Sequence, residues 1–290
     1  MTTDHVDHPV VLPGRPADGH KGTFGRTLIV AGSRGMSGAA ALAGLGALRS
    51  GTGLVTVAVP ESIEQVVASL EPSYMVAGLP EDEAGRLSVA AGAKICDLAD
   101  QATAIAIGPG WGQGDELGGL VAHLYESISV PLVVDADGLN GLAHMSVPAA
   151  REGRSPRVLT PHPGEMSRLL GMAIPEIEAD RKGCARQLSE LTGAVVVLKG
   201  RGTVISGGGR NIVNSTGNSG LATGGSGDVL SGLLAGLLAR QMEAFDAARL
   251  GVFLHGLAAD LAVEELTESG LVASDLPDWI PAAWSAVTEN

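Results

Sequence analysis

Aromatic and basic side chains are both scarce in this chain of 290 residues. Phe, Trp and Tyr together make up 3% of it, and its 19 Lys and Arg stand against 32 Asp and Glu, which gives a formal net charge of −13. Proteins that bind single-stranded nucleic acid stack bases on aromatic rings, and nucleic-acid binders are usually basic. The composition therefore argues against nucleic acid as a partner.

Cysteine is rare as well, and long apolar runs are lacking. The 2 cysteines, Cys96 and Cys184, lie far apart with no paired spacing, which argues against a zinc site or a disulfide scaffold and fits a reducing compartment. No apolar run approaches the roughly 18 residues of a membrane span, and the polar residues 1–8 do not resemble a signal peptide. We therefore predict a cytoplasmic protein with no membrane partner.

Glycine, in contrast, is abundant. It accounts for 42 of the 290 residues, whereas about 7% is usual. Because there is no Gly-X-Y repeat, the excess must serve tight turns and close approaches of the backbone. Hydrophobic residues make up 45% of the chain, enough for a large core. We predict a flexible lead-in over residues 1–20 and a single domain over residues 21–290.

Short apolar segments alternate with helical patterns along the chain. The expected strands are 27–31, 54–59, 103–107, 131–134, 157–159 and 195–198, followed by a hairpin of 203–205 and 211–213. The expected helices are 37–50, 61–70, 88–99, 115–127, 176–191, 227–240 and 244–266. Strands that are apolar throughout predict an α/β fold with a central, mostly parallel sheet flanked by helices on both faces. The stretch 71–87 has the weakest pattern, and we leave open whether it forms a flap or a subunit contact.

Unusual segments follow five of these strands. They are 32–38, 108–114, 135–140, 160–165 and 199–203. Parallel sheets of this kind bind ligands beyond the carboxyl ends of their strands. We therefore expect the five segments to face one cleft.

Two common nucleotide-binding motifs are missing. The chain contains no GxxxxGK[ST] sequence, which excludes a P-loop protein. The segment 32–38, GSRGMSG, does not match GxGxxG, which weakens a dinucleotide-binding interpretation.

The most distinctive motif is NSTGNSGLATGGSGDVLSG, at residues 214–232. Its glycines permit a tight turn that aims backbone N–H groups at one point, and the helix that starts there adds the positive end of its dipole. The candidate anion hole consists of Gly224, Gly225 and Ser226. Asp228, in the first helical turn, is either an ordinary helix-start carboxylate or a base that faces a phosphate-accepting hydroxyl.

The other strand ends carry polar residues, and each of these has one functional and one purely structural interpretation. Lys199 and Thr203, expected near the rim of the cleft, could hold nucleotide phosphates or lie in a hairpin turn. His162 stands between two prolines that fix its backbone, so it is either a held functional imidazole or part of a helix cap. It lacks a partner at the spacing of a zinc site, and the metal ligands stay unassigned. Asp135 and Asp137 could bind Mg²⁺ or a ribose hydroxyl, or form an Asp/Gly turn.

Taken in order, several segments resemble the ADP-dependent NAD(P)H-hydrate dehydratase family of the ribokinase-like superfamily. They are 21–25 (KGTFG), 31–38, 49–53 (RSGTG), 108–110, 135–140, 160–165 (TPHPGE) and the glycine-rich motif. The resemblance covers roughly residues 20–265 and implies a ribokinase-like fold. It also implies dehydration of the (6S) hydrate of NADH or NADPH to NAD(P)H, with ADP as phosphoryl donor, Mg²⁺ as cofactor, and AMP and phosphate as products.

By motif position, the resemblance also implies roles for individual residues. Contacts with the hydrate would come from Ala40, Gly110, His162 and Asp228, with Asp228 as the catalytic base. The AMP portion of the nucleotide would be held by Lys199, Gly200, Arg201, Gly202, Thr203 and Gly227.

The resemblance further implies a homo-oligomer, often a tetramer. Since nothing before Lys21 has the length of a domain, we expect the NAD(P)H-hydrate epimerase of this pathway to be a separate protein. Two alternatives remain: a ribokinase-like kinase of a hydroxymethylpyrimidine or thiazole alcohol, and a nucleotide-binding sensor without catalysis. The sequence leaves open the preference between the two hydrates.

Overall fold

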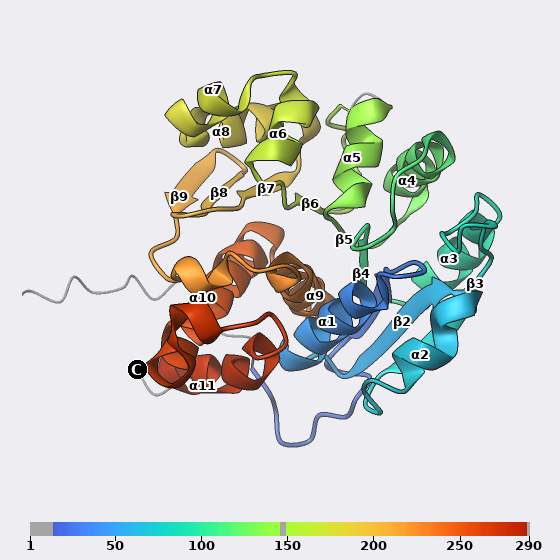
Figure 1. The fold of residues 1–290 in the computed structure, drawn as a ribbon, viewed down its shortest axis with the longest axis horizontal. Coiled ribbons are helices and arrows are strands. Elements are labelled where there is room, and N and C mark those ends of the chain that lie inside the picture. Colours follow the sequence, from blue (N-terminus) through green and yellow to red (C-terminus); the bar gives the residue numbers. More distant parts are fainter. Residues whose placement is uncertain (1–13, 146–148, 289–290) are drawn as a thin grey trace, which may run out of the picture.

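The computed structural model describes residues 14–145 and 149–288, and within them the strands form one nine-stranded sheet (Figure 1). The strands are β1 (Arg26–Val30), β2 (Leu54–Pro60), β3 (Met75–Leu79), β4 (Ala104–Ile107), β5 (Leu132–Val134), β6 (Arg157–Leu159), β7 (Val195–Leu198), β8 (Val204–Gly207) and β9 (Arg210–Val213). Their order is β3-β2-β1-β4-β5-β6-β7-β8-β9. The pairs from β3 to β7 are parallel, and β8 and β9 complete the sheet as an antiparallel hairpin.

Helices lie between most of the parallel strands. They are α1 (Ser37–Arg49), α2 (Glu64–Ala68), α3 (Ala91–Ala99), α4 (Asp115–Ser127), α5 (Asp137–His144), α6 (Pro163–Leu170), α7 (Ile174–Ala179), α8 (Arg181–Thr192), α9 (Ser226–Ala239), α10 (Ala244–Gly270) and α11 (Leu276–Thr288), with 3₁₀ turns η1 (Glu61–Ile63) and η2 (Ser219–Leu221). Helices α9, α10 and α11 follow the last strand. Of the predicted lead-in, residues 1–13 lie outside the described residues, and 14–20 form turns and irregular structure. Among the described helices, none combines the length and apolar character needed to cross a bilayer.

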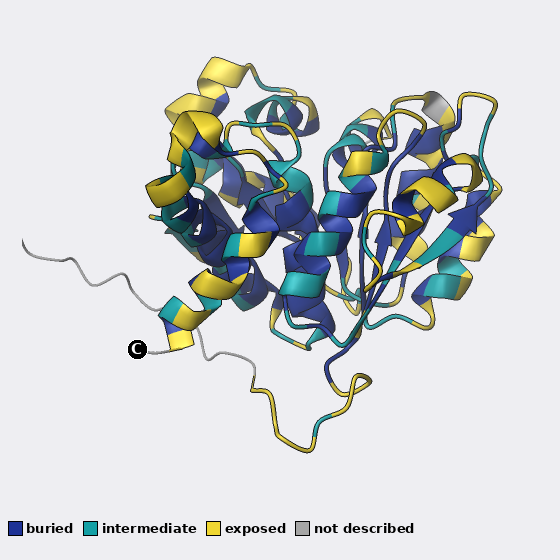
Figure 2. Ribbon diagram, turned by 60° about the horizontal axis from the view of Figure 1, so that its bottom comes forward, coloured by how far each residue is buried: buried dark blue, intermediate teal, exposed yellow. Residues whose placement is uncertain are grey.

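Helices cover both faces of the sheet, which confirms the predicted fold class. Side chains from alternate strand positions enter two separate cores, as the two-residue period of a strand requires. One core includes Ile29 and Val133 and is closed by α1, α2, α9, α10 and α11. The other includes Leu28 and Leu132 and is closed by α3 to α8. Figure 2 shows the buried strands between these layers and the exposed residues on the outer faces of the helices.

The fold differs from the prediction in several places. The single helix expected over 176–191 is two helices, because Asp180 leaves the helical conformation and its side chain caps α8 by accepting from Gly183 N at 2.8 Å. The weakly patterned stretch 71–87 contains the edge strand β3, which pairs in parallel with β2. Residues 80–88 then form a narrow turn that docks on the β1–α1 loop, where Arg34 N donates to the Gly85 carbonyl at 2.9 Å.

Helices α1 and α9 pack with their backbones in contact. A side chain at Gly232 would place its Cβ 1.8 Å from the Ala43 carbonyl oxygen, and one at Gly46 would lie 2.1 Å from the Val229 carbonyl oxygen. Only glycine allows this approach. The close packing brings the start of α9, with its glycine-rich turn, to the carboxyl ends of the parallel strands.

Candidate active site

The five segments singled out in the sequence lie at one edge of the sheet, each at the carboxyl end of its strand. Main-chain hydrogen bonds join neighbouring segments: Gly32 N donates to the Pro109 carbonyl at 2.7 Å, and Lys199 N donates to the Pro161 carbonyl at 2.8 Å. The segment after β5 lies between these pairs and carries Asp135. The polar residues of this edge can therefore act together.

Asp135 is the centre of the site. It is 1% exposed, and both of its carboxylate oxygens accept hydrogen bonds from protein donors. Oδ1 accepts from Lys199 Nζ at 2.5 Å and from Thr160 Oγ1 at 2.7 Å, and Oδ2 accepts from Ser231 Oγ at 2.6 Å. Asp135 thus joins β5, β6, β7 and α9.

Lys199 lies inside the site, not at its rim as expected. Its ammonium group pairs with Asp135 and stands 3.9 Å from Glu165 Oε2. Burial opposes the charge of Lys199, but these two carboxylates outweigh burial and raise the pKa of Lys199 above its usual value. A side chain at Gly227 would lie 3.4 Å from Lys199 Nζ, so the ammonium faces the first turn of α9.

Asp228 occupies that first turn and is half-buried. Burial is the main cause that raises the pKa of Asp228 from 3.8 to about 7, and the negative charge of Asp135 adds to it, while Lys199 acts in the opposite direction. A carboxyl group with a pKa near neutrality is suited to accept a proton during catalysis. The role of Asp228 as a base stays a prediction.

The glycine-rich turn forms where the sequence predicts it. Gly225 is the N-cap of α9 with a φ of 96°, a conformation that favours glycine. A side chain there would also meet Leu42 at 2.5 Å, whereas nothing lies within 4 Å of a Cβ at Gly224. The Ser226 hydroxyl donates to the Leu221 carbonyl at 2.8 Å and so steadies the turn. Binding of an anion by these residues stays a prediction.

His162 caps α6, which is one of the two roles considered for it, and its contact with the hydrate stays a prediction. Its Nδ1 accepts hydrogen bonds from Gly164 N at 2.9 Å and Glu165 N at 3.2 Å, and the Glu165 carboxylate accepts from His162 N at 2.7 Å, which makes a capping box for α6. Because Nδ1 accepts, the neutral ring carries its proton on Nε2. The side chain is 50% exposed, and its Nε2 lies 3.3 Å from Glu165 Oε1.

Burial and the neighbouring charged side chains shift the pKa values of His162 and Glu165. Burial, followed by the positive charges of Lys199 and Arg168, lowers the pKa of His162. Burial raises the pKa of Glu165 to about 7, although Lys199 acts against it. The imidazole is therefore neutral near neutral pH, and its capping role, which needs an unprotonated Nδ1, is preserved.

The remaining predicted hydrate contacts, Ala40 and Gly110, belong to the segments that follow β1 and β4. Ala40, in α1, is fully buried against Gly32, so only its neighbours can expose main-chain groups to a ligand. Gly110 has a φ of 66° and faces Met36 and Ala39, where a side chain would meet Ala39 Cβ at 2.8 Å. Both residues therefore stay predictions.

The residues predicted to hold AMP form a turn between β7 and β8. Gly200 has a φ of 131° and Gly202 a φ of 65°, and the Thr203 hydroxyl donates to the Gly200 carbonyl at 3.0 Å. Arg201 is exposed in this turn. Arg181 also stabilises the turn, because its guanidinium donates to the Lys199 carbonyl at 3.0 Å. Lys199 thus lies between the rest of this turn and Gly227.

Sequence reasoning missed several residues of the site. Thr160 and Ser231 were not assigned, although both are fully buried donors to Asp135. The position of Ser231, three residues after Asp228 on the same helix, is the signal that could have found it. Ala136 was also missed: its φ of 48° and ψ of −119° are rare for a residue with a side chain, and such strain is common at functional sites.

Among the described residues, no group of three or more His, Cys, Asp and Glu side chains is arranged to hold a metal ion. Asp137 accepts from Gly112 N at 2.8 Å, and the carboxylate of Asp135 accepts from Lys199, Thr160 and Ser231. Mg²⁺ is commonly bound through one or two carboxylates together with substrate phosphates and water. The donor set fits an ion that arrives with a nucleotide.

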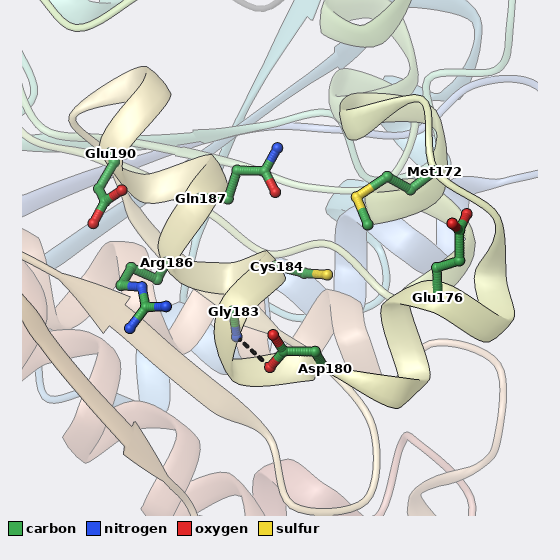
Figure 3. A pocket seen from close by; sticks show the side chains of 8 residues that line it. All are labelled: Met172, Glu176, Asp180, Gly183, Cys184, Arg186, Gln187 and Glu190. Carbon is green, nitrogen blue, oxygen red and sulfur yellow. Dashed lines mark hydrogen bonds between the residues drawn. The ribbon is translucent and has the colours of Figure 1, made fainter.

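A separate pocket of about 290 Å³ lies between α7 and α8 (Figure 3). It is lined by Met172, Glu176, Asp180, Gly183, Cys184, Arg186, Gln187 and Glu190. None of the predicted site residues borders it. Cys184 and Cys96 are both free thiols, as the absence of paired spacing led us to expect.

The fold has a polar site at the carboxyl ends of its parallel strands and a glycine-rich turn before a helix. It belongs to the ribokinase-like class. A ribokinase-like superfamily protein from Enterococcus faecalis, 26% identical, superimposes with a TM-score of 0.77 over 94% of this chain and 92% of its own. A sequence model described as NAD(P)H-hydrate dehydratase matches residues 27–282. The chain therefore belongs to the NAD(P)H-hydrate dehydratase family.

Individual relatives agree with this assignment. The ADP-dependent (S)-NAD(P)H-hydrate dehydratase of Bacillus subtilis is 37% identical over 98% of this chain and 96% of its own length. The crystal structure of the ADP/ATP-dependent NAD(P)H-hydrate dehydratase from Bacillus subtilis, co-crystallised with ATP and Mg²⁺, is 34% identical with a TM-score of 0.82, over 95% of this chain and 94% of that chain. A bifunctional NAD(P)H-hydrate repair enzyme from Moorella thermoacetica is 43% identical over 93% of this chain but only 51% of its own length. The chain thus spans about half the length of the bifunctional relatives that it matches.

Proposed function

We propose that this protein catalyses the ADP-dependent dehydration of (6S)-hydrated NADH and NADPH, and returns NAD(P)H, AMP and phosphate. Family membership supports the reaction type. The observation that carries the proposal is the position of Asp228: a carboxyl with a pKa of about 7, in the first turn of α9, next to the Lys199–Asp135 pair.

The chemistry follows from the poor leaving ability of hydroxide. Asp228 takes the proton of the hydrate's hydroxyl while that oxygen attacks the terminal phosphorus of ADP, and the bond to AMP breaks. The hydroxyl is then a phosphate ester, which leaves readily. The lone pair of the ring nitrogen expels phosphate, and loss of a ring proton restores the double bond.

The surroundings of Asp228 favour this transfer. The dipole of α9 and the N–H groups of the glycine-rich turn are aimed at the place where negative charge develops. Lys199 adds a fixed positive charge beside Gly227, whose lack of a side chain keeps the space between them open. His162 donates from Nε2 and orients the hydrate, since its ring is fixed by the α6 cap.

Nucleotide and metal would bind next to each other. The turn of residues 199–203 and Gly227 would hold the AMP portion. Mg²⁺, when bound, neutralises charge on the donor's phosphates. We further propose a homo-oligomer.

Incubation with NADH hydrate, Mg²⁺ and either ADP or ATP tests the function. We expect the absorbance of the reduced ring to recover, faster with ADP than with ATP. A clear preference for ATP would contradict the assigned donor. Phosphorylation of a hydroxymethylpyrimidine or thiazole alcohol without hydrate repair would favour the kinase alternative, and nucleotide binding without any turnover would favour the sensor.

A further inference from the structure

Helix α10 holds the glycine-rich segment that leads into α9. Thr216 Oγ1 donates to the Phe253 carbonyl of α10 at 2.9 Å. The Asp260 carboxylate accepts from Gly217 N at 2.8 Å and from Asn218 Nδ2 at 2.9 Å. Residues 216–218 are therefore fixed by contacts with a single helix.

His255 extends this support to the first turn of α9. Its ring is buried, and Nε2 lies 2.9 Å from the carbonyl oxygen of Ser226. Because a carbonyl only accepts hydrogen bonds, Nε2 must carry the proton. Burial lowers the pKa of His255 to about 4, so the ring is neutral near neutral pH and its Nε2–H donates to Ser226.

The Ser226 carbonyl belongs to the turn that carries Asp228. Ser226 is the first residue of α9, and its hydroxyl donates in another direction, to the Leu221 carbonyl at 2.8 Å. A carbonyl oxygen has two lone pairs, so it can accept from His255 as well as from the helix. His255 and Leu221 thus hold the main chain of the turn from two sides.

We propose that His255 and Asp260 are positioning residues for phosphoryl transfer, which hold the glycine-rich turn so that Asp228 faces the reacting hydroxyl. They act through the main chain at Ser226 and Gly217 and need no contact with substrate. The inference rests on the proposed function of Asp228. A turn rich in glycine has few conformational limits of its own, and a displacement of about 1 Å at a reacting group can lower the rate by about 100-fold.

Substitution of His255 separates positioning from packing. His255→Gln keeps an N–H donor of similar reach, whereas His255→Leu keeps bulk and loses the donor. We expect His255→Leu to lower kcat by about 10- to 100-fold with little change in the KM for NADH hydrate, and His255→Gln to restore most of the rate. Leu250→Ala, a packing change on the same helix, should lower thermal stability without lowering kcat.

A titration of Asp228 without substrate gives a readout that does not depend on turnover. Carbon NMR, with the signal identified by its loss in Asp228→Asn, should show a lower pKa for Asp228 in His255→Leu, because a loosened turn exposes the carboxyl, and recovery in His255→Gln. If wild-type protein fails to repair the hydrate, the proposed function is wrong while this comparison still holds.

Two outcomes decide the proposal. An unchanged Asp228 pKa and unchanged kcat in folded His255→Leu would overturn it. If that variant does not fold, Asp260→Asn takes its place, since the amide offers a donor where Gly217 N and Asn218 Nδ2 need acceptors. A lowered kcat in folded Asp260→Asn supports the positioning role, and a wild-type kcat rejects it.

Discussion

Lys199 Nζ lies 2.5 Å from Asp135 Oδ1, and this buried ion pair lies next to the helix turn that carries Asp228. The two partners act on Asp228 in opposite directions: the charge of Asp135 raises its pKa and that of Lys199 lowers it. Removal of water from two charges is costly, and a buried pair is weak evidence for stability on its own. Here the pair has a chemical consequence, because it helps to set the protonation of the proposed base.

The rate of hydrate repair should therefore depend on pH with an acidic limb near pH 7. A base must be unprotonated to work, so kcat/KM should rise as pH passes the Asp228 pKa of about 7. Asp135→Asn removes the neighbouring negative charge and should move this limb to lower pH by roughly one unit. The measurement is kcat/KM from pH 5 to 9 for both proteins. A folded Asp135→Asn variant whose limb stays in place would show that Asp135 does not tune the base.

Asp228→Asn should nearly abolish repair. Loss of a general base lowers rates by about 100- to 10,000-fold. Asn keeps the size and place of the side chain, so ADP should bind with a Kd close to that of the wild type. Turnover with NADH hydrate and calorimetric titration with ADP give the two numbers. Near-normal turnover of this variant would remove Asp228 from the mechanism.

The same variant should change the pH dependence of stability. The pKa of Asp228 is about 7 in the folded protein and near 3.8 when unfolded, so folding favours the protonated form. Its contribution is fully present below about pH 4 and is lost as pH rises through 7. Asp228→Asn escapes this loss, so its Tm should exceed that of the wild type by a few degrees at pH 8 and by much less at pH 4. An equal difference at both pH values would contradict the raised pKa.

Two variants of His162 separate its cap from its N–H donor. His162→Ala loses both, whereas His162→Asn keeps a good N-cap and loses only the Nε2–H. Both should raise the KM for NADH hydrate more than the Kd for ADP. His162→Ala should in addition lose about 1 kcal/mol of stability, measured by urea unfolding. If both variants weaken hydrate and ADP equally, the assignment of His162 to the hydrate is wrong.

The strand ends were predictable because fully apolar strands require a covered parallel sheet, and such sheets gather their carboxyl ends at one edge. That placed Asp135, His162 and Lys199 in the same region, whereas Asp228 was singled out by the glycine-rich motif alone. The contacts among them were not predictable, since Ser231 and Asp135 are separated by 96 residues and meet only after α9 docks on α1. The helix α11 was not predicted, and it contains Pro277 and Pro281.

The packing of α9 against α1 gives a last prediction, on stability. A Cβ at Gly232 would lie 1.8 Å from the Ala43 carbonyl oxygen, so Gly232→Ala must push the two helices apart. We expect a loss of about 1–3 kcal/mol or more, together with lower activity, because the same packing places the turn that carries Asp228. Gly119→Ala is the matched control: Gly119 is exposed within α4, and nothing lies within 4 Å of its Cβ position. Alanine there should add about 0.5–1 kcal/mol through helix propensity alone. Urea unfolding of the two variants measures both effects, and equal changes would mean that the α1–α9 contact yields easily.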